Sequence, residues 1–254
     1  LDISSGKTST LTTYGITTPR YSTSNGVTQI SPLLINNGSL RLSGASLVVS
    51  GGLLNIGTVD IDGQTATRSG AYLRIPSSAT FENRGTLNLN FDGSYGGWSL
   101  LSNPSTQDGV LLNKGLVSLN SGYSALEVAF TNTNTGHVLL APGSALSMQN
   151  GRSLSGSFQL RAGSTLWFPE QHGVDASFEA ATITGPGRIQ VLGSSPRVRF
   201  DAATVFQNPS GLLADLPGLI LGSGGSVQLD GNTRLSSYRQ NAGVLSGSGS
   251  LAIS

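Results

Sequence analysis

Residues 34–42 read Leu-Ile-Asn-Asn-Gly-Ser-Leu-Arg-Leu, a phrase that returns along most of the chain. It holds an Asn, a Gly two positions later, and then apolar residues that alternate with polar ones. Copies with both key residues follow at 53–61, 81–89, 111–119 and 132–140, the last with Asn134 and Gly136. Looser copies, with Gly or Ser in place of the Asn, span 183–191, 221–229 and 245–253. Self-similarity on this scale indicates a repeat architecture.

The spacing of the phrase predicts the size of one repeat. Nine marker glycines run from Gly38 to Gly249, so eight intervals cover 211 residues, or about 26 residues each. A repeat of this length with strand periodicity is typical of one coil of a solenoid. Alternation after each Gly predicts a strand with one buried face. We expect Asn-x-Gly to form the corner, because Asn and Gly enter left-handed backbone conformations at low cost.

A second recurring phrase, Gly-Ala/Ser-Ser/Ala/Thr-Leu, predicts another side of the coil, and its copies are residues 44–47, 143–146 and 163–166. The predicted fold is all-β: a right-handed parallel β-helix (solenoid) of roughly ten coils with loop insertions. Ten coils stacked about 4.8 Å apart would make a rod roughly 45–50 Å long. A β-sandwich or barrel, also built of short strands and Gly-rich turns, is the alternative.

The corner phrase divides the chain into two parts. Residues 1–32 lack it and are rich in Ser and Thr, so they are expected to form an amino-terminal capping segment. Residues 33–254 are expected to form one continuous β-helix domain. The residues expected to point into its core are Leu40, Leu42, Val59, Ile61, Leu87, Leu89, Val117, Leu119, Val138, Leu140, Ile189, Val191, Val227 and Leu229.

Composition excludes several classes of protein. Charged residues make up 11% of the 254, the net charge is +1 and there is no basic stripe, so nucleic-acid binding is not expected. The chain has no Cys, which excludes disulfides and thiolate metal sites. There is no run of 18 apolar residues, so no membrane insertion is expected. No cofactor is predicted.

The two ends of the sequence carry an expectation of their own. Because the chain begins at Leu1 without an initiator Met or signal peptide, we expect it to be processed or excised from something longer. The last copy of the phrase ends at Ile253 with no cap, so further β-helix segments of the same polypeptide are expected beyond Ser254. The exposed last coil is expected to favour end-to-end association.

Aromatic residues are the first candidates for ligand binding. A long insertion over residues 91–110 holds Tyr95 and Trp98 in Gly-rich sequence, and either ring could stack on a sugar. Alternatively, Trp98 folds back over an end of the core. Farther along, alternation places one of Trp167 and Phe168 inward and exposes the other, which makes Trp167 a further candidate.

Charged residues give two weaker candidates. If corners stack, Arg84 and Lys114 lie on neighbouring coils and could bind a small anionic group, although exposed cations at turns are usually only solvated. Asp60 and Asp62 lie on one face of a strand, where paired carboxylates could bind a metal ion or act as acid and base. The alternative is that they form the outward face of that strand. No catalytic residues are assigned, because neither histidine has a Ser or Asp partner that the sequence singles out.

Two stretches resemble a known group of proteins. Residues 241–251 are similar to the strand repeat of bacterial autotransporter passengers, and residues 130–168 resemble repeats of filamentous-haemagglutinin-like surface proteins. The resemblance implies a secreted right-handed β-helix, commonly an adhesin or surface fibre. The secretion domain of the haemagglutinin group carries Asn-Pro-Asn, whereas this chain has Asn-Pro-Ser at 103–105 and 208–210, so an internal segment is expected.

Together these observations favour an extracellular structural or adhesive module of a larger secreted or cell-surface protein. Its expected partners are a glycan or a neighbouring or host cell surface, reached through the loop insertions. The alternatives are a polysaccharide lyase or hydrolase and a phage tail-fibre or spike module. Asp60 and Asp62 would be the carboxylates of the enzyme, with Arg84 or Lys114 as base or charge neutraliser.

Overall fold

The chain is built almost entirely of short parallel strands. The computed structural model describes residues 2–4, 20–24, 27–31, 33–43, 46–63, 71–76, 79–91, 99–102, 109–149, 151–169, 175–208 and 215–253. These ranges contain thirty-two strands and no α-helix, hence no helix that is long and apolar enough to cross a membrane.

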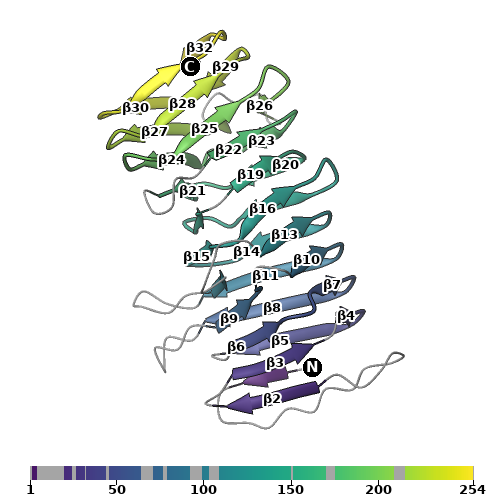
Figure 1. The fold of residues 1–254 in the computed structure, drawn as a ribbon. Helices are drawn as coiled ribbons and strands as arrows, with labels where there is room; N and C mark the ends of the chain where they lie inside the picture. Colours follow the sequence, from purple (N-terminus) through teal and green to yellow (C-terminus); the bar gives the residue numbers. More distant parts are fainter. Residues whose placement is uncertain are drawn as a thin grey trace.

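Three long sheets, which we call A, B and C, run the length of the molecule (Figure 1). Sheet A has nine strands: β1 (Asp2–Ser4), β5 (Ser39–Ser43), β8 (Thr58–Gly63), β11 (Thr86–Phe91), β14 (Leu116–Leu119), β17 (His137–Leu140), β20 (Ser157–Leu160), β23 (Thr182–Thr184) and β26 (Val205–Gln207). Sheet B has eleven: β2 (Arg20–Ser24), β3 (Val27–Ser31), β6 (Ser46–Val49), β9 (Ala71–Arg74), β12 (Ser99–Ser102), β15 (Tyr123–Leu126), β18 (Ala145–Met148), β21 (Thr165–Phe168), β24 (Arg188–Leu192), β27 (Gly218–Gly222) and β30 (Ser237–Gln240). Sheet C has ten: β4 (Leu34–Asn36), β7 (Leu53–Asn55), β10 (Thr80–Asn83), β13 (Val110–Asn113), β16 (Ala129–Asn132), β19 (Gly151–Leu154), β22 (Asp175–Phe178), β25 (Arg197–Phe200), β28 (Ser226–Leu229) and β31 (Val244–Ser246). A fourth sheet pairs β29 (Thr233–Leu235) with β32 (Leu251–Ile253).

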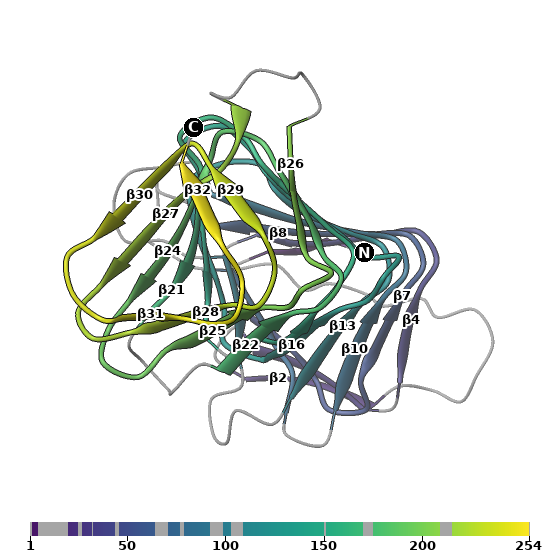
Figure 2. The same cartoon turned by 90° about the horizontal axis from the view of Figure 1, so that it is seen from above.

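The chain visits the sheets in the fixed order B, C, A, and from β6 onward each visit pairs in parallel with the one before, except that β29 pairs with β32 and not with β26. Strands β6, β7 and β8 make one coil, and β9, β10 and β11 lie directly upon them. Strands β3 to β32 thus form ten coils of three strands each, within the described part of the chain. Seen from the carboxyl-terminal end, the chain turns counterclockwise as it rises toward the viewer (Figure 2), which is a right-handed sense. The predicted parallel β-helix of roughly ten coils is confirmed.

The amino-terminal segment adds strands to two of the sheets. β1 pairs in parallel with β5 at the end of sheet A, and β2 pairs antiparallel with β3 at the end of sheet B. Sheet C begins at β4. The two termini lie at opposite ends of the rod (Figure 1), and Val244 and Ile253 of the last coil are 57% and 52% exposed.

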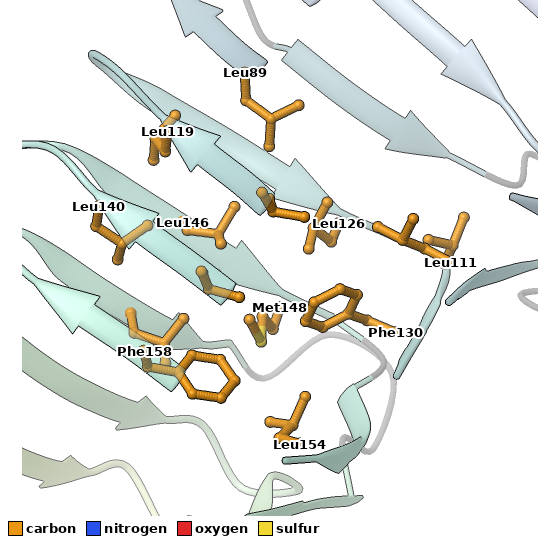
Figure 3. Close-up of a cluster of buried hydrophobic side chains, with 14 of the residues drawn as sticks. Leu89, Leu111, Leu119, Leu126, Phe130, Leu140, Leu146, Met148, Leu154 and Phe158 are labelled. Atoms are coloured by element: carbon orange, nitrogen blue, oxygen red, sulfur yellow. The ribbon is translucent and has the colours of Figure 1, made fainter. Parts of the chain in front are cut away.

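The core is a continuous stack of apolar side chains between the three sheets. All fourteen residues predicted to point inward are buried, which confirms the predicted strand register. In the middle of the rod, Leu89, Leu119 and Leu140 form one column, and Phe130 and Met148 face it from the other sheets (Figure 3). Toward the carboxyl end the filling becomes aromatic: Phe178 meets Phe158, Phe168 and Phe200.

The predicted reason for glycine at the Asn-x-Gly corner is wrong. None of Gly57, Gly85 and Gly115 has a positive φ. They are required because successive corners stack: a Cβ at Gly85 would lie 2.0 Å from the carbonyl oxygen of Gly57, and one at Gly115 would lie 2.2 Å from that of Gly85. Left-handed glycines do occur in the second phrase, where Gly143 and Gly163 have φ of 72° just before strands of sheet B.

Two of the looser copies lie at other corners than the sequence suggests. Asn-x-Gly joins sheet C to sheet A, but residues 183–191 join β23 of sheet A to β24 of sheet B, and residues 221–229 join β27 of sheet B to β28 of sheet C. Residues 245–253 do join β31 to the β29–β32 position that follows sheet C. Because the coils differ in loop length, similar phrases in the sequence fall at different corners of the coil.

Candidate functional site

The most ordered polar feature is a column of buried asparagines along the corner between sheets C and A. Asn36, Asn55, Asn83, Asn113 and Asn132 occupy the last position of five successive sheet C strands, in register. Each Nδ2 donates to Oδ1 of the next asparagine, at distances of 2.7, 2.7, 2.8 and 2.7 Å. We call this column the Asn ladder.

Every rung also holds the backbone of the following coil. The second N–H of Asn55 donates to the carbonyl of Thr86 at 3.0 Å, and that of Asn83 donates to the carbonyl of Leu116 at 3.0 Å. Asn83 and Asn113 are fully buried with both amide ends bonded, which confirms their predicted role at the corner. The ladder therefore satisfies donors and acceptors that would otherwise be costly to bury.

The fifth corner differs from its prediction. The sequence places Asn134 in the key position, but Asn132 joins the ladder, and Asn134 lies exposed in a turn. Two additional residues lengthen this corner, and Asn132 Nδ2 donates to the carbonyls of Gly136 and Ser155. The ladder ends there, because the next coils place Leu154, Phe178 and Phe200 in the same column. Phe178 and Phe200 stack with ring centroids 4.6 Å apart and an interplanar angle of 15°.

The two candidate cations, Arg84 and Lys114, do lie on neighbouring corners, but a carboxylate already stands between them. Glu82 Oε1 accepts from Arg84 Nε at 2.7 Å and from Lys114 Nζ at 2.8 Å. The Lys114 ammonium and then the Arg84 guanidinium lower the pKa of the Glu82 carboxyl, and slight burial opposes this effect. The candidate anion site is thus occupied by a side chain of the chain itself.

Asp60 and Asp62 lie on the outer face of β8, as the alternative interpretation expected. Asn88 donates to Asp60 and Asn90 donates to Asp62, each at 2.7 Å and each from the following coil. Arg41 of the preceding coil forms an ion pair with Asp62. Among the described residues, no group of three or more His, Asp or Glu could hold a metal ion. These carboxylates join three coils on the surface of sheet A.

Trp167 lies on the outer face of sheet B and Phe168 is buried, so one of the two points inward and the other outward, as alternation predicts. Its ring meets that of Tyr123 edge to face, with centroids 5.9 Å apart and an interplanar angle of 63°. Burial raises the pKa of the Tyr123 hydroxyl; the hydroxyl of Ser147 opposes this shift and the charge of Glu127 adds to it. Tyr123 was not predicted from the sequence, because its contact with Trp167 spans two coils.

Tyr95 and Trp98 lie outside the described residues, so their role stays a prediction.

His137 Nδ1 lies within hydrogen-bond distance of Ser157 Oγ, directly opposite it in the pairing of β17 with β20. No sequence pattern points to this pair, because only the stacking of coils brings the two residues together. Both side chains lie on the outside of the rod, where they join neighbouring strands.

We compared the chain with family models, with characterised proteins and with solved structures, and none of them matches at a significant level.

Proposed function

We propose that this chain is a rigid extracellular module that spaces and presents binding surfaces as part of a larger secreted or cell-surface protein. The observation that carries the proposal is the continuity of polar contacts between coils. The Asn ladder links five coils without a break, and the surface network of Asp60, Asp62 and their partners links the same region from outside. A rod held in this way transmits force along its axis and keeps its faces in fixed positions.

The proposed partner is a glycan on a neighbouring or host cell surface. Outward aromatic side chains on a regular scaffold support it, because an aromatic ring presents a large, rigid contact area at a low cost in conformational entropy. The polysaccharide-cleaving alternative draws less support from the same site. The carboxylates of Asp60 and Asp62 accept hydrogen bonds from Asn88 and Asn90, and Glu82 is paired with two cations.

Adhesion of protein-coated beads tests the proposal. Beads that carry the purified chain should adhere to cell layers or to immobilised cell-surface glycans more strongly than beads coated with an unrelated β-rich protein. Electron microscopy of the same preparation should show straight rods. Adhesion equal to the control on every surface, or release of new reducing ends or unsaturated products from a polysaccharide panel, would reject the adhesive function.

A further inference from the structure

The outer face of sheet B carries a distinct group of side chains on strands β15, β18, β21 and β24. Two outward columns run side by side: Tyr123, Ala145, Thr165 and Arg188 form one, and Ala125, Ser147, Trp167 and Gln190 form the other. The coil between the two aromatic residues carries the small residues Ala145 and Ser147. The coil after Trp167 carries the polar residues Arg188 and Gln190.

The small residues allow the two rings to form one surface. Tyr123 and Trp167 are two coils apart, so their backbones are separated by roughly 9.6 Å, yet their ring centroids lie 5.9 Å apart. The rings lean toward each other over the coil between them, where Ser147 is fully buried although it points outward. The two rings together form one aromatic surface on the outside of the rod.

The indole nitrogen of Trp167 adds a polar feature. Its N–H is shielded from solvent and makes no hydrogen bond. An unpaired buried donor costs about 1–3 kcal/mol, so its presence in a native structure calls for an explanation. A ligand oxygen that reaches this N–H would gain a hydrogen bond that the free protein lacks.

The coil that follows Trp167 supplies a cation and an amide. Arg188 is exposed and makes no ion pair with any residue that the structure describes, unlike Arg41, Arg84 and Arg199, which each face a carboxylate. The next coil places Gly218 beside Arg188, so no side chain covers the guanidinium from that strand. Gln190 follows Trp167 in the same column and can both donate and accept a hydrogen bond.

From this arrangement we propose that the face formed by Tyr123, Trp167, Arg188 and Gln190 binds an acidic oligosaccharide that lies along the rod. A pyranose ring packs on the aromatic surface, and a uronate carboxylate pairs with the Arg188 guanidinium, whose planar fork matches a carboxylate. The proposal rests on the adhesive function above and assigns its ligand class. It also moves the binding site from the loop around Trp98 to the face of a sheet.

Tryptophan emission provides a direct test, because the chain contains two tryptophans and a Trp98→Phe background leaves Trp167 alone. This protein is titrated with a hyaluronan tetrasaccharide, which carries glucuronate, and with chitotetraose, which is neutral. We expect saturable binding that shifts the emission of Trp167, with the acidic sugar bound at least about tenfold more tightly. Arg188→Gln should remove that preference, whereas Arg152→Gln, an exposed arginine on sheet C, should leave it intact.

Several outcomes would overturn the proposal. They are no binding of either sugar by calorimetry, an unchanged preference in Arg188→Gln, or binding by the unsubstituted chain that Trp98→Phe abolishes. Thermal unfolding of each variant shows whether it remains folded. If beads still adhere to cells after Trp167→Ala, the adhesive function stands and this site falls. If the tetrasaccharide binds but beads adhere nowhere, the site stands and the adhesive function falls.

Discussion

Replacement of Asn83 by Ala removes the middle rung of the Asn ladder. Three hydrogen bonds are lost: the one that Asn83 accepts from Asn55, and the two that it donates to Asn113 and to the carbonyl of Leu116. Asn83 is fully buried, so water cannot replace these partners without opening the corner. The perturbation therefore reaches the coils on both sides.

The magnitude follows from the number of bonds. Each buried hydrogen bond contributes about 1 kcal/mol net, so the loss of three lowers the free energy of unfolding by about 3 kcal/mol, and by more where a former partner stays unpaired. Asn83→Asp should be worse at neutral pH, because a carboxylate can accept from Asn55 but cannot donate to Asn113 or Leu116. Burial raises the pKa of the new carboxyl group above its unfolded value, so this extra penalty shrinks as the pH falls and the group takes up a proton.

Urea unfolding followed by far-ultraviolet circular dichroism measures these effects. The midpoint should fall for Asn83→Ala with an unchanged slope, since the surface exposed on unfolding stays the same. Asn37→Ala is the matched control, because Asn37 lies exposed at a corner of the same motif. Equal midpoints for the Asn83 and Asn37 variants, or an Asn83→Asp variant as stable as the original chain, would refute the ladder as a source of stability.

Three further predictions concern stability. Gly85→Ala should lower the free energy of unfolding by roughly 3 kcal/mol, because its Cβ would lie 2.0 Å from the Gly57 carbonyl oxygen. The control Gly38→Ala, whose Cβ would have nothing within 4 Å, should change it by less than about 0.5 kcal/mol. Similar urea midpoints for the two variants would contradict the stacking of corners. Ala180→Gly should raise the midpoint of thermal unfolding, because Ala180 has a φ of 52° and glycine removes the cost, roughly 1 kcal/mol, of a left-handed backbone at a residue with a Cβ. A lower midpoint would be inconsistent with strain at this position. Glu82→Gln should lower the free energy of unfolding above pH about 4.5, because the ionised Glu82, whose pKa is lowered in the folded chain, forms two ion pairs there. The difference in unfolding free energy between this variant and the original chain should vanish as the pH falls through the folded pKa of Glu82. A difference that persists at pH 2 would exclude ionisation of Glu82 as its cause.

The sequence alone determined the class of fold and the direction of its side chains. Alternation after each Gly placed Leu40, Leu89 and Leu140 in the core, because a strand presents successive residues to opposite faces whatever its partner is. It also predicted that one of Trp167 and Phe168 points inward and the other outward, and it identified Asn83 and Asn113 as corner residues. These features depend on local periodicity, which any window of a few residues displays.

The tertiary structure decided what those residues contact. Asn83 bonds to Asn55 and Asn113, 28 and 30 residues away, and Gly85 is needed because the preceding corner lies against it. Glu82 neutralises Lys114 across 32 residues, and Tyr123 meets Trp167 across two coils. Loops of variable length separate these partners, so their spacing in the sequence follows no fixed period. Hydrogen bonding between successive strands sets the register instead, which is why Asn132 rather than Asn134 joins the ladder.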